Sequence, residues 1–373
     1  MPLNSFSQGW LAALFLAGAL PASAQLSNSA PDPLARIREA SKSNVQACSA
    51  TGETLCEQVA PKIIAIEQAE TPLAENLRGM VLQLSIPKLQ IREEVVAWGV
   101  AAFRAAGVAV HTEQNAWPQT GVGAAEGAQD AVVAEIRGRE KPDEWVVLGT
   151  QIDGHAPATI RTASNAALIV EAARDIQLTG IRPRRSIRFV LLIGALGDTP
   201  GSWPYVHAHG DELDRARAAI FFSGGEGRVT GYALNGRHDL ESVVREAMKP
   251  IEALDAGHNI FDVPAGTPSL DFLLEGIPTI TSNQKDDQQD DENAGNVSRL
   301  SEALAAVKIQ ELKRNTEIAA VTAFGIAERA EPPGTRESRS EIQSLLKANG
   351  LEKQMKIAGV WPLWESGQRG RRP

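Results

Sequence analysis

Short apolar strands that alternate with helices between residues 108 and 282 constrain the fold of this chain more than any other feature of its sequence. Strand-like runs occur at 108–112, 131–136, 145–148, 187–193, 218–222 and 278–282. The segment 164–177 between them has the apolar spacing of an amphipathic helix. Strands separated by helices of about 10–15 residues form a largely parallel sheet with helices on both faces. The run 187–193 is apolar at almost every position, as expected of a strand buried on both faces.

At least one pairing in this sheet is predicted to be antiparallel. Lys141-Pro142-Asp143-Glu144 has the composition of a tight turn, so the strands on either side of it, 131–136 and 145–148, are expected to pair as a hairpin. Helical spacing also predicts helices at 77–85, 93–106 and 298–330. The predicted fold class is therefore α/β, with a mixed, mostly parallel central sheet, helices on both faces and an N-terminal helical extension.

The N-terminus has the pattern of a secretory signal peptide. An apolar run from Trp10 to Leu20 is too short to span a bilayer, and Ala22-Ser23-Ala24 after it is the small-x-small pattern that signal peptidase cleaves. We expect a signal peptide over residues 1–24, cleaved near Ala24, and a secreted or periplasmic protein. A buried N-terminal helix is the alternative. No later stretch is apolar over membrane-spanning length.

The rest of the chain divides into three parts. An N-terminal helical extension covers 25–72, the α/β domain covers 73–330, and a polar tail covers 331–373. The extension contains the two cysteines, Cys48 and Cys56, which are expected to form a local disulfide in an oxidising compartment, although two free thiols would also fit. The basic end of the tail, 369–372, is expected to be a disordered terminus.

Net charge excludes one class of partner. The chain has 37 Lys and Arg against 46 Asp and Glu, a formal charge of −9. An acidic protein is poorly suited to binding the phosphates of nucleic acid, so no nucleic-acid partner is expected.

Six segments carry a resemblance to a known family. They are 132–138, 141–149, 165–174, 183–189, 201–206 and 273–278. These segments resemble the secreted co-catalytic zinc exopeptidases of metallopeptidase family twenty-eight, which includes leucyl-type aminopeptidases and glutamate carboxypeptidases. The resemblance covers about residues 73–330. It implies an exopeptidase domain in which His, Asp and Glu side chains hold two zinc ions and a glutamate activates the attacking water.

This chain departs from the family pattern at each position that the resemblance assigns to the metal or to the base. Gln151 stands for the histidine of the first motif, although its Asp153 remains, and Ser164 stands for the aspartate shared by both zinc ions. Ala195 and Leu196 replace the paired glutamates, and Ser223 replaces a further aspartate. No histidine follows His258 to supply the last ligand. We call Gln151, Asp153, Ser164, Ala195, Leu196 and Ser223 the vestigial site.

Three functions follow as alternatives. The favoured one is a secreted, catalytically inactive homologue that binds a peptide or a protein, with no metal ligands, no catalytic residues and no cofactor expected. The second is an active aminopeptidase-type metallo-exopeptidase whose zinc is held by a remodelled set of residues. The third is a structural protein of the cell envelope without a ligand pocket.

Other clusters of reactive residues are less consistent with a site. Asp153 and His155 with Ser164 or Ser223 have the composition of a Ser-His-Asp triad, but no Gly-x-Ser-x-Gly motif accompanies them. The pair His207 and His209 is expected at a surface helix end. The acidic run 286–292 lacks the spacing of an EF-hand loop and is expected to be a solvated loop.

Overall fold

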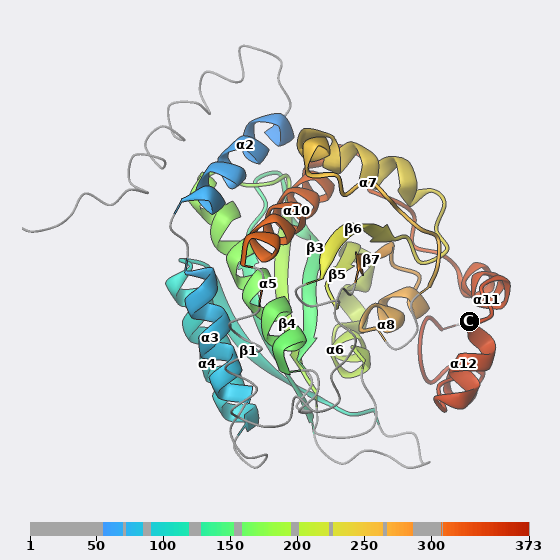
Figure 1. The fold of residues 1–373 in the computed structure, drawn as a ribbon. Coiled ribbons are helices and arrows are strands. Elements are labelled where there is room, and N and C mark those ends of the chain that lie inside the picture. Colours follow the sequence, from blue (N-terminus) through green and yellow to red (C-terminus); the bar gives the residue numbers. More distant parts are fainter. Residues whose placement is uncertain are drawn as a thin grey trace, which may run out of the picture.

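The computed structural model describes residues 55–69, 72–84, 91–118, 128–152, 159–194, 201–223, 227–263, 267–285, 307 and 309–372 (Figure 1). The predicted signal peptide, Cys48 and the acidic run 286–292 lie outside the described residues. In the part of the chain that is described, no helix is long and apolar enough to cross a bilayer.

A seven-stranded mixed sheet forms the centre of the molecule. Its order is β1-β2-β4-β3-β5-β7-β6. The strands are β1 (Ala109–Ala116), β2 (Ala128–Ile136), β3 (Lys141–Ile152), β4 (Arg185–Ile193), β5 (Ala216–Phe221), β6 (Arg228–Ala233) and β7 (Thr279–Lys285). The four adjacent strands β4, β3, β5 and β7 are parallel, while β1, β2 and β6 join antiparallel at the two sides. The predicted α/β fold class with a mixed sheet is confirmed.

The predicted hairpin between 131–136 and 145–148 is wrong, because β4 lies between the two strands. Val132 on β2 is opposite Leu191, and Leu148 on β3 is opposite Phe189. The predicted turn residues Lys141–Glu144 are the first residues of β3, where the register with β4 shifts. Inserting β4 between β2 and β3 buries an apolar strand on both faces, which a direct hairpin would not do.

Helices cover both faces of the sheet, as predicted (Figure 1). The larger apolar core lies on one face, between the sheet and a layer of long helices. These are α2 (Leu55–Gln68), α3 (Leu73–Leu84), α4 (Ile91–Ala105), α5 (Thr159–Thr179), α7 (Leu240–Met248) with the 3₁₀ turn Lys249–Leu254, and α10 (Ile309–Glu328). A second core lies on the opposite face against α6 (Trp203–Ala208), the 3₁₀ turn Gly210–Arg215 and α8 (Ser269–Leu274). Successive strand residues alternate between the two cores: Val146 faces the first and Val147 the second.

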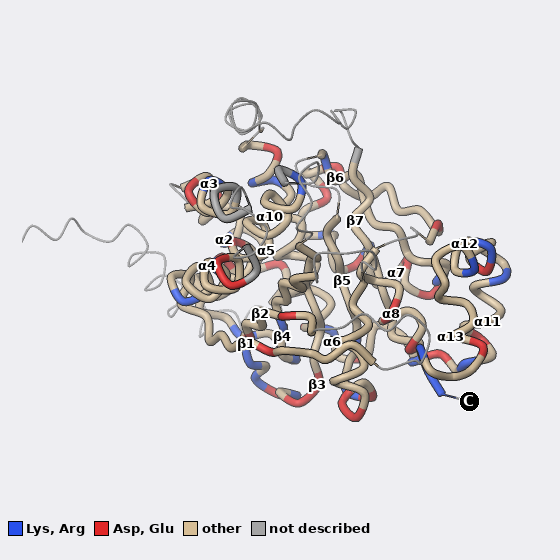
Figure 2. Tube along the Cα trace, turned by 90° about the horizontal axis from the view of Figure 1, so that it is seen from below, with Lys and Arg blue, Asp and Glu red and all other residues tan. Residues whose placement is uncertain are grey.

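The charged residues lie mainly around this core. Figure 2 shows acidic and basic residues interspersed along the periphery, while the strands in the middle are mostly uncharged.

The tail is folded, so the prediction of a disordered basic terminus is wrong. It forms α11 (Arg339–Ala348), α12 (Leu351–Ile357) and α13 (Trp361–Glu365), which build an apolar cluster with Leu274 of α8. Beyond α13, Arg369 is only 3% exposed, and its Nε donates to Oδ1 of the buried Asp271 at 2.7 Å. The same guanidinium lies 4.7 Å from the ring of Trp203. Asp271, almost a hundred residues earlier, thus supplies the counter-charge for Arg369, in addition to the apolar packing of the three helices.

The cysteine prediction is only partly covered by the structure. Cys56 lies half-buried in α2 with a free thiol, and its predicted partner Cys48 is outside the described residues. Burial, with the Glu328 and Glu57 carboxylates, raises the pKa of the Cys56 thiol to about 11. The Cys48–Cys56 disulfide therefore stays a prediction.

We expect Arg369→Ala to lower the free energy of unfolding by about 3–5 kcal/mol, because it leaves the buried Asp271 carboxylate without its counter-charge. Urea denaturation measures this change. Arg372→Ala, at an exposed position of the same terminus, is the matched control and should change stability by less than about 0.5 kcal/mol. Equal stability of the two variants would mean that the ion pair does not anchor the tail.

Candidate binding site at the strand ends

The carboxyl ends of three adjacent parallel strands meet at one edge of the sheet. Strand β3 lies between β4 and β5, and all three run in the same direction. The chain leaves β3 through α5 to reach β4 on one side, and later forms β5 on the other side. This reversal of strand order creates the crevice in which open α/β sheets bind ligands.

Three residues of the vestigial site lie in the described part of this region. Gln151 is the next-to-last residue of β3, opposite Leu192, and is 8% exposed. Ser223 follows β5 by two residues and is half-buried. Ser164 lies inside α5, fully buried, and its Oγ has no hydrogen-bond partner among the described residues.

The other three members of the vestigial site, Asp153, Ala195 and Leu196, lie outside the described residues, as does His155 of the alternative Ser-His-Asp triad. Of the two histidines at the end of α6, His207 is exposed and His209 is engaged elsewhere. His209 Nε2 lies 2.9 Å from Glu113 Oε2, and its ring centroid lies 4.4 Å from that of Tyr205, with the two rings tilted by 43°. Burial works against ionisation of Glu113, but its contacts with His209 and His111 outweigh this and lower its pKa.

The described side chains at these strand ends do not fit a zinc centre. Zinc in proteins is held by thiolate, imidazole or carboxylate groups, whereas Gln151, Ser164 and Ser223 offer an amide and two hydroxyls. Across the described ranges, the one group of three or more His, Cys, Asp or Glu close enough to share a metal is Glu67, Glu171 and Asp175. That group lies between helices α2 and α5, away from the strand ends.

A pocket of about 570 Å³ opens beside Ser223, and we call it the strand-end pocket. Strands β6 and β7, the segment 260–263 and the C-terminal helices supply its walls. It is lined by Ser223, Ala233, Ile260, Asp262, Val263, Ser282, Asn283, Gln284, Asn349 and Gln354. Asp262 is the one ionisable residue of this set, so the pocket is polar but almost uncharged.

Part of the polar lining is held in place by the protein, and part is available to a ligand. The Ser282 hydroxyl donates to Gln284 Oε1 at 2.7 Å, and Gln284 Nε2 donates to the Gly227 carbonyl at 3.0 Å. The side chains of Ser223, Asn283 and Gln354 make no hydrogen bond to the other described residues. A hydroxyl and two amides can both donate and accept, so this surface suits an uncharged hydrogen-bonding ligand.

The sequence analysis identified one residue of the strand-end pocket, Ser223, through the family resemblance. Asn283 and Gln284 lie within β7 and carry no motif. Asn349 ends α11 and Gln354 lies in α12, in the segment expected to be a polar tail. The sequence has no local signal for this contribution, because it depends on how the C-terminal helices pack against the domain.

No protein-family model matches this chain. Human transferrin receptor protein 2 is 32% identical over 91 residues, which are 24% of this chain and 11% of that protein. Carboxypeptidase Q of Xenopus laevis is 22% identical over 148 residues, 39% of this chain and 31% of that protein. The chain thus spans less than a third of the length of either relative.

Solved structures extend the likeness to the whole domain. A peptidase M28 precursor from Shewanella amazonensis superposes with a TM-score of 0.59 at 14% identity, covering 76% of this chain and 99% of that chain. This similarity establishes the fold: the chain has the α/β architecture of the M28 peptidases.

Replacing Ser164 tests whether this site tolerates the family's carboxylate. We expect Ser164→Asp to lower the free energy of unfolding by about 3 kcal/mol or more, because it places a charge at a fully buried position. Ser164→Ala should change it by less than about 1 kcal/mol, since the native hydroxyl has no partner among the described residues. Chemical denaturation measures both. Recovery of Ser164→Asp stability on adding zinc would contradict our assignment, because it would reveal further ligands nearby.

Proposed function

From the fold it shares with the M28 peptidases, we propose that this chain is a secreted, catalytically inactive protein that binds a peptide segment in the strand-end pocket. The observation that carries the proposal is the chemistry of the strand ends. Where the family resemblance calls for carboxylates and imidazoles, this chain has Gln151, Ser164 and Ser223, and the pocket beside Ser223 is lined almost entirely by neutral polar groups.

Loss of catalysis follows from the residues that are missing. Hydrolysis by this family requires zinc ions to polarise the substrate carbonyl and a carboxylate to activate the water. Ala195 and Leu196 stand where the resemblance places the base and one ligand, and neither can accept a proton or bind a metal. The remaining amide and hydroxyls are too weakly basic to take over either role.

A peptide is the ligand class that best matches the pocket. Its backbone presents alternating N–H donors and C=O acceptors without charge. The side chains of Ser223, Asn283 and Gln354 can accept hydrogen bonds from these N–H groups and donate to these C=O groups. Asp262 adds one negative charge at the rim, which favours a peptide carrying an amine or a guanidinium near the bound segment.

The names of the relatives are consistent with a binding role on this fold. One is called a transferrin receptor and the other a carboxypeptidase, so related sequences occur in a binding protein as well as in an enzyme. Because the matched regions are short, neither the ligand of the one nor the activity of the other is assigned to this chain.

The secreted location rests on residues 1–24. Expression of the full chain in a bacterial host, followed by N-terminal sequencing of the periplasmic fraction, should give a protein that begins at Gln25. A product that keeps residues 1–24 and stays with the cytoplasmic fraction would contradict this location.

Filling the strand-end pocket tests the binding proposal. The mature chain would be dialysed against a tryptic digest of casein, and the retained peptides identified by mass spectrometry. We expect wild type to retain a defined set of peptides and Ser223→Trp to retain less than a tenth of it, because the indole occupies the pocket. Ser344→Trp, on the exposed face of α11, is the matched control and should behave as wild type. Equal retention by Ser223→Trp, or no retention by wild type, would contradict the proposal.

A further inference from the structure

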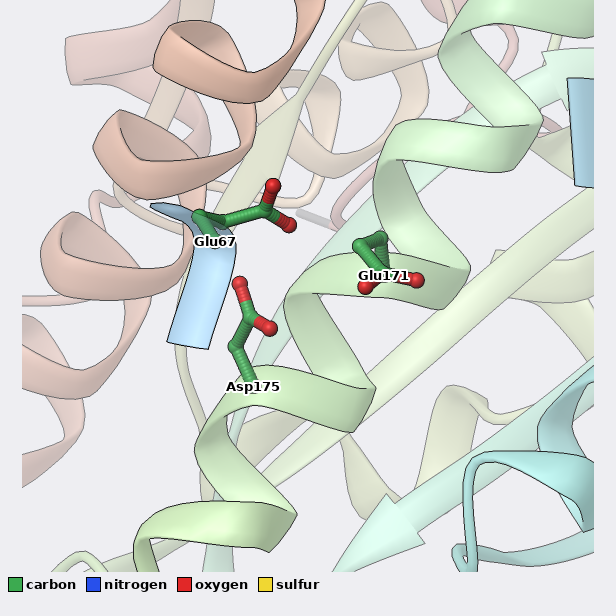
Figure 3. Close-up of side chains that lie close together, drawn as sticks. All are labelled: Glu67, Glu171 and Asp175. Carbon is green, nitrogen blue, oxygen red and sulfur yellow. The ribbon is translucent and has the colours of Figure 1, made fainter. Parts of the chain in front are cut away.

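Three buried carboxyl groups from two helices converge in the layer that covers the sheet (Figure 3). Glu171 and Asp175 are four residues apart on α5, so they lie on the same side of that helix. Glu67, near the end of α2, points toward them. One oxygen of each group lies within 4.8 Å of the others, and all three residues are 0% exposed. We call Glu67, Glu171 and Asp175 the carboxyl triad.

The neighbouring cations do not balance the charge of this triad. Arg174 Nη1 lies 2.6 Å from Glu171 Oε1 and 3.8 Å from Asp175 Oδ1. On the α10 side, Lys313 Nζ donates to the backbone carbonyls of Glu67 and Ala69, at 2.7 and 3.2 Å. Its charge lowers the pKa of Glu67 and of Glu171, but burial outweighs this effect. Glu317 of α10 adds a further carboxyl near Glu67, and burial raises its pKa to about 7.

Glu67 joins the triad from a different helix, α2, whereas Glu171 and Asp175 both belong to α5. Both oxygens of Glu67 are buried and have no hydrogen-bond partner among the described residues. The same is true of both Asp175 oxygens and of Glu171 Oε2. Burying that many unpaired carboxylate oxygens is costly, so the native state needs a group that binds them.

The spacing of these oxygens suits a single cation, which can reach all three groups at once. A proton on Glu67 or Asp175 can join only these two by a hydrogen bond, a contact that shifts the pKa of both, and it leaves Glu171 Oε2 without a partner. Oxygens that surround one cation at about 2.0–2.6 Å lie up to about 4–5 Å apart, which matches the observed arrangement.

We propose that Glu67, Glu171 and Asp175 bind one hard divalent cation, of the Ca²⁺, Mg²⁺ and Mn²⁺ class, which fastens α2 to α5. The donor set consists of carboxylate oxygens alone, and such sets select hard cations over zinc or copper. The site is distinct from the family's zinc centre, since it lies among α2, α5 and α10 and not at the carboxyl ends of the strands.

Electrostatics supports this assignment. Burial and the neighbouring Glu171 carboxylate raise the pKa of Glu67 to about 8, and burial also raises the pKa of Glu171 and of Asp175. Without a bound cation the folded protein therefore favours protonated carboxyls. Its stability should then fall as the pH rises from about 5 toward 8, because the unfolded chain ionises at lower pH. A divalent cation would offset this loss near neutral pH.

The experiment compares metal-free and metal-loaded mature protein at pH 7.5. Protein stripped with EDTA and desalted would be melted with added CaCl₂, MgCl₂ or MnCl₂. We expect at least one cation to raise Tm saturably by about 5 °C. Glu67→Gln should abolish the shift. Glu57→Gln, at an exposed position on the same helix, is the matched control and should keep it.

A second measurement does not depend on a variant that folds. Mn²⁺ bound to wild type should give a broadened electron paramagnetic resonance signal with one ion per chain, and an excess of Ca²⁺ should displace it. The absence of any cation-dependent change in both assays would overturn the proposal. Tm that rises on acidification from pH 8 to 5, with no response to any of the three metals, would show that protons occupy the triad instead.

Discussion

The insertion of β4 between β2 and β3 is the contact on which the rest of the structure depends. The apolar strand β4 is hydrogen-bonded to β2 on one edge and to β3 on the other. Its Phe189 and Leu191 side chains pack into the core on one face of the sheet, and Val190 and Leu192 pack into the core on the opposite face. Hydrophobic burial is the main favourable term in folding, and eight of the nine residues of β4 are buried. This insertion also places β3 beside β5, with their carboxyl ends at one edge of the sheet.

Sequence reasoning succeeded where the information is local. The apolar runs and helical spacing identified six of the strands and the main helices, and the predicted fold class is confirmed. It failed where pairing is decided at long range. The turn-like Lys141–Glu144 suggested a hairpin that β4 prevents. Strand β6 was missed because it contains Gly231, a residue uncommon in strands. Glycine is needed there only because the His258 carbonyl packs against this position.

The C-terminal segment illustrates the same limit. Read alone, 369–372 is a run of basic residues at a chain end, yet Arg369 is buried against Asp271. The vestigial site could be named from the sequence because a family pattern fixed which positions to inspect. The strand-end pocket could not, because Asn349 and Gln354 reach it through the packing of α11 and α12. The carboxyl triad was also missed, since Glu67 lies about a hundred residues before its partners on α5.

The chain thus combines the fold of the M28 peptidases with a different distribution of charge. Neutral groups stand at the described strand ends, while three buried carboxyls lie among the helices. We propose that these strand ends do not bind zinc. The most direct test is the zinc content of the zinc-loaded, desalted mature protein, measured with leucine-anilide turnover on the same sample. We predict no turnover and almost no zinc per chain, because the described strand ends lack zinc ligands and the carboxyl triad prefers hard cations. Two zinc ions per chain with chelator-sensitive turnover would contradict the account.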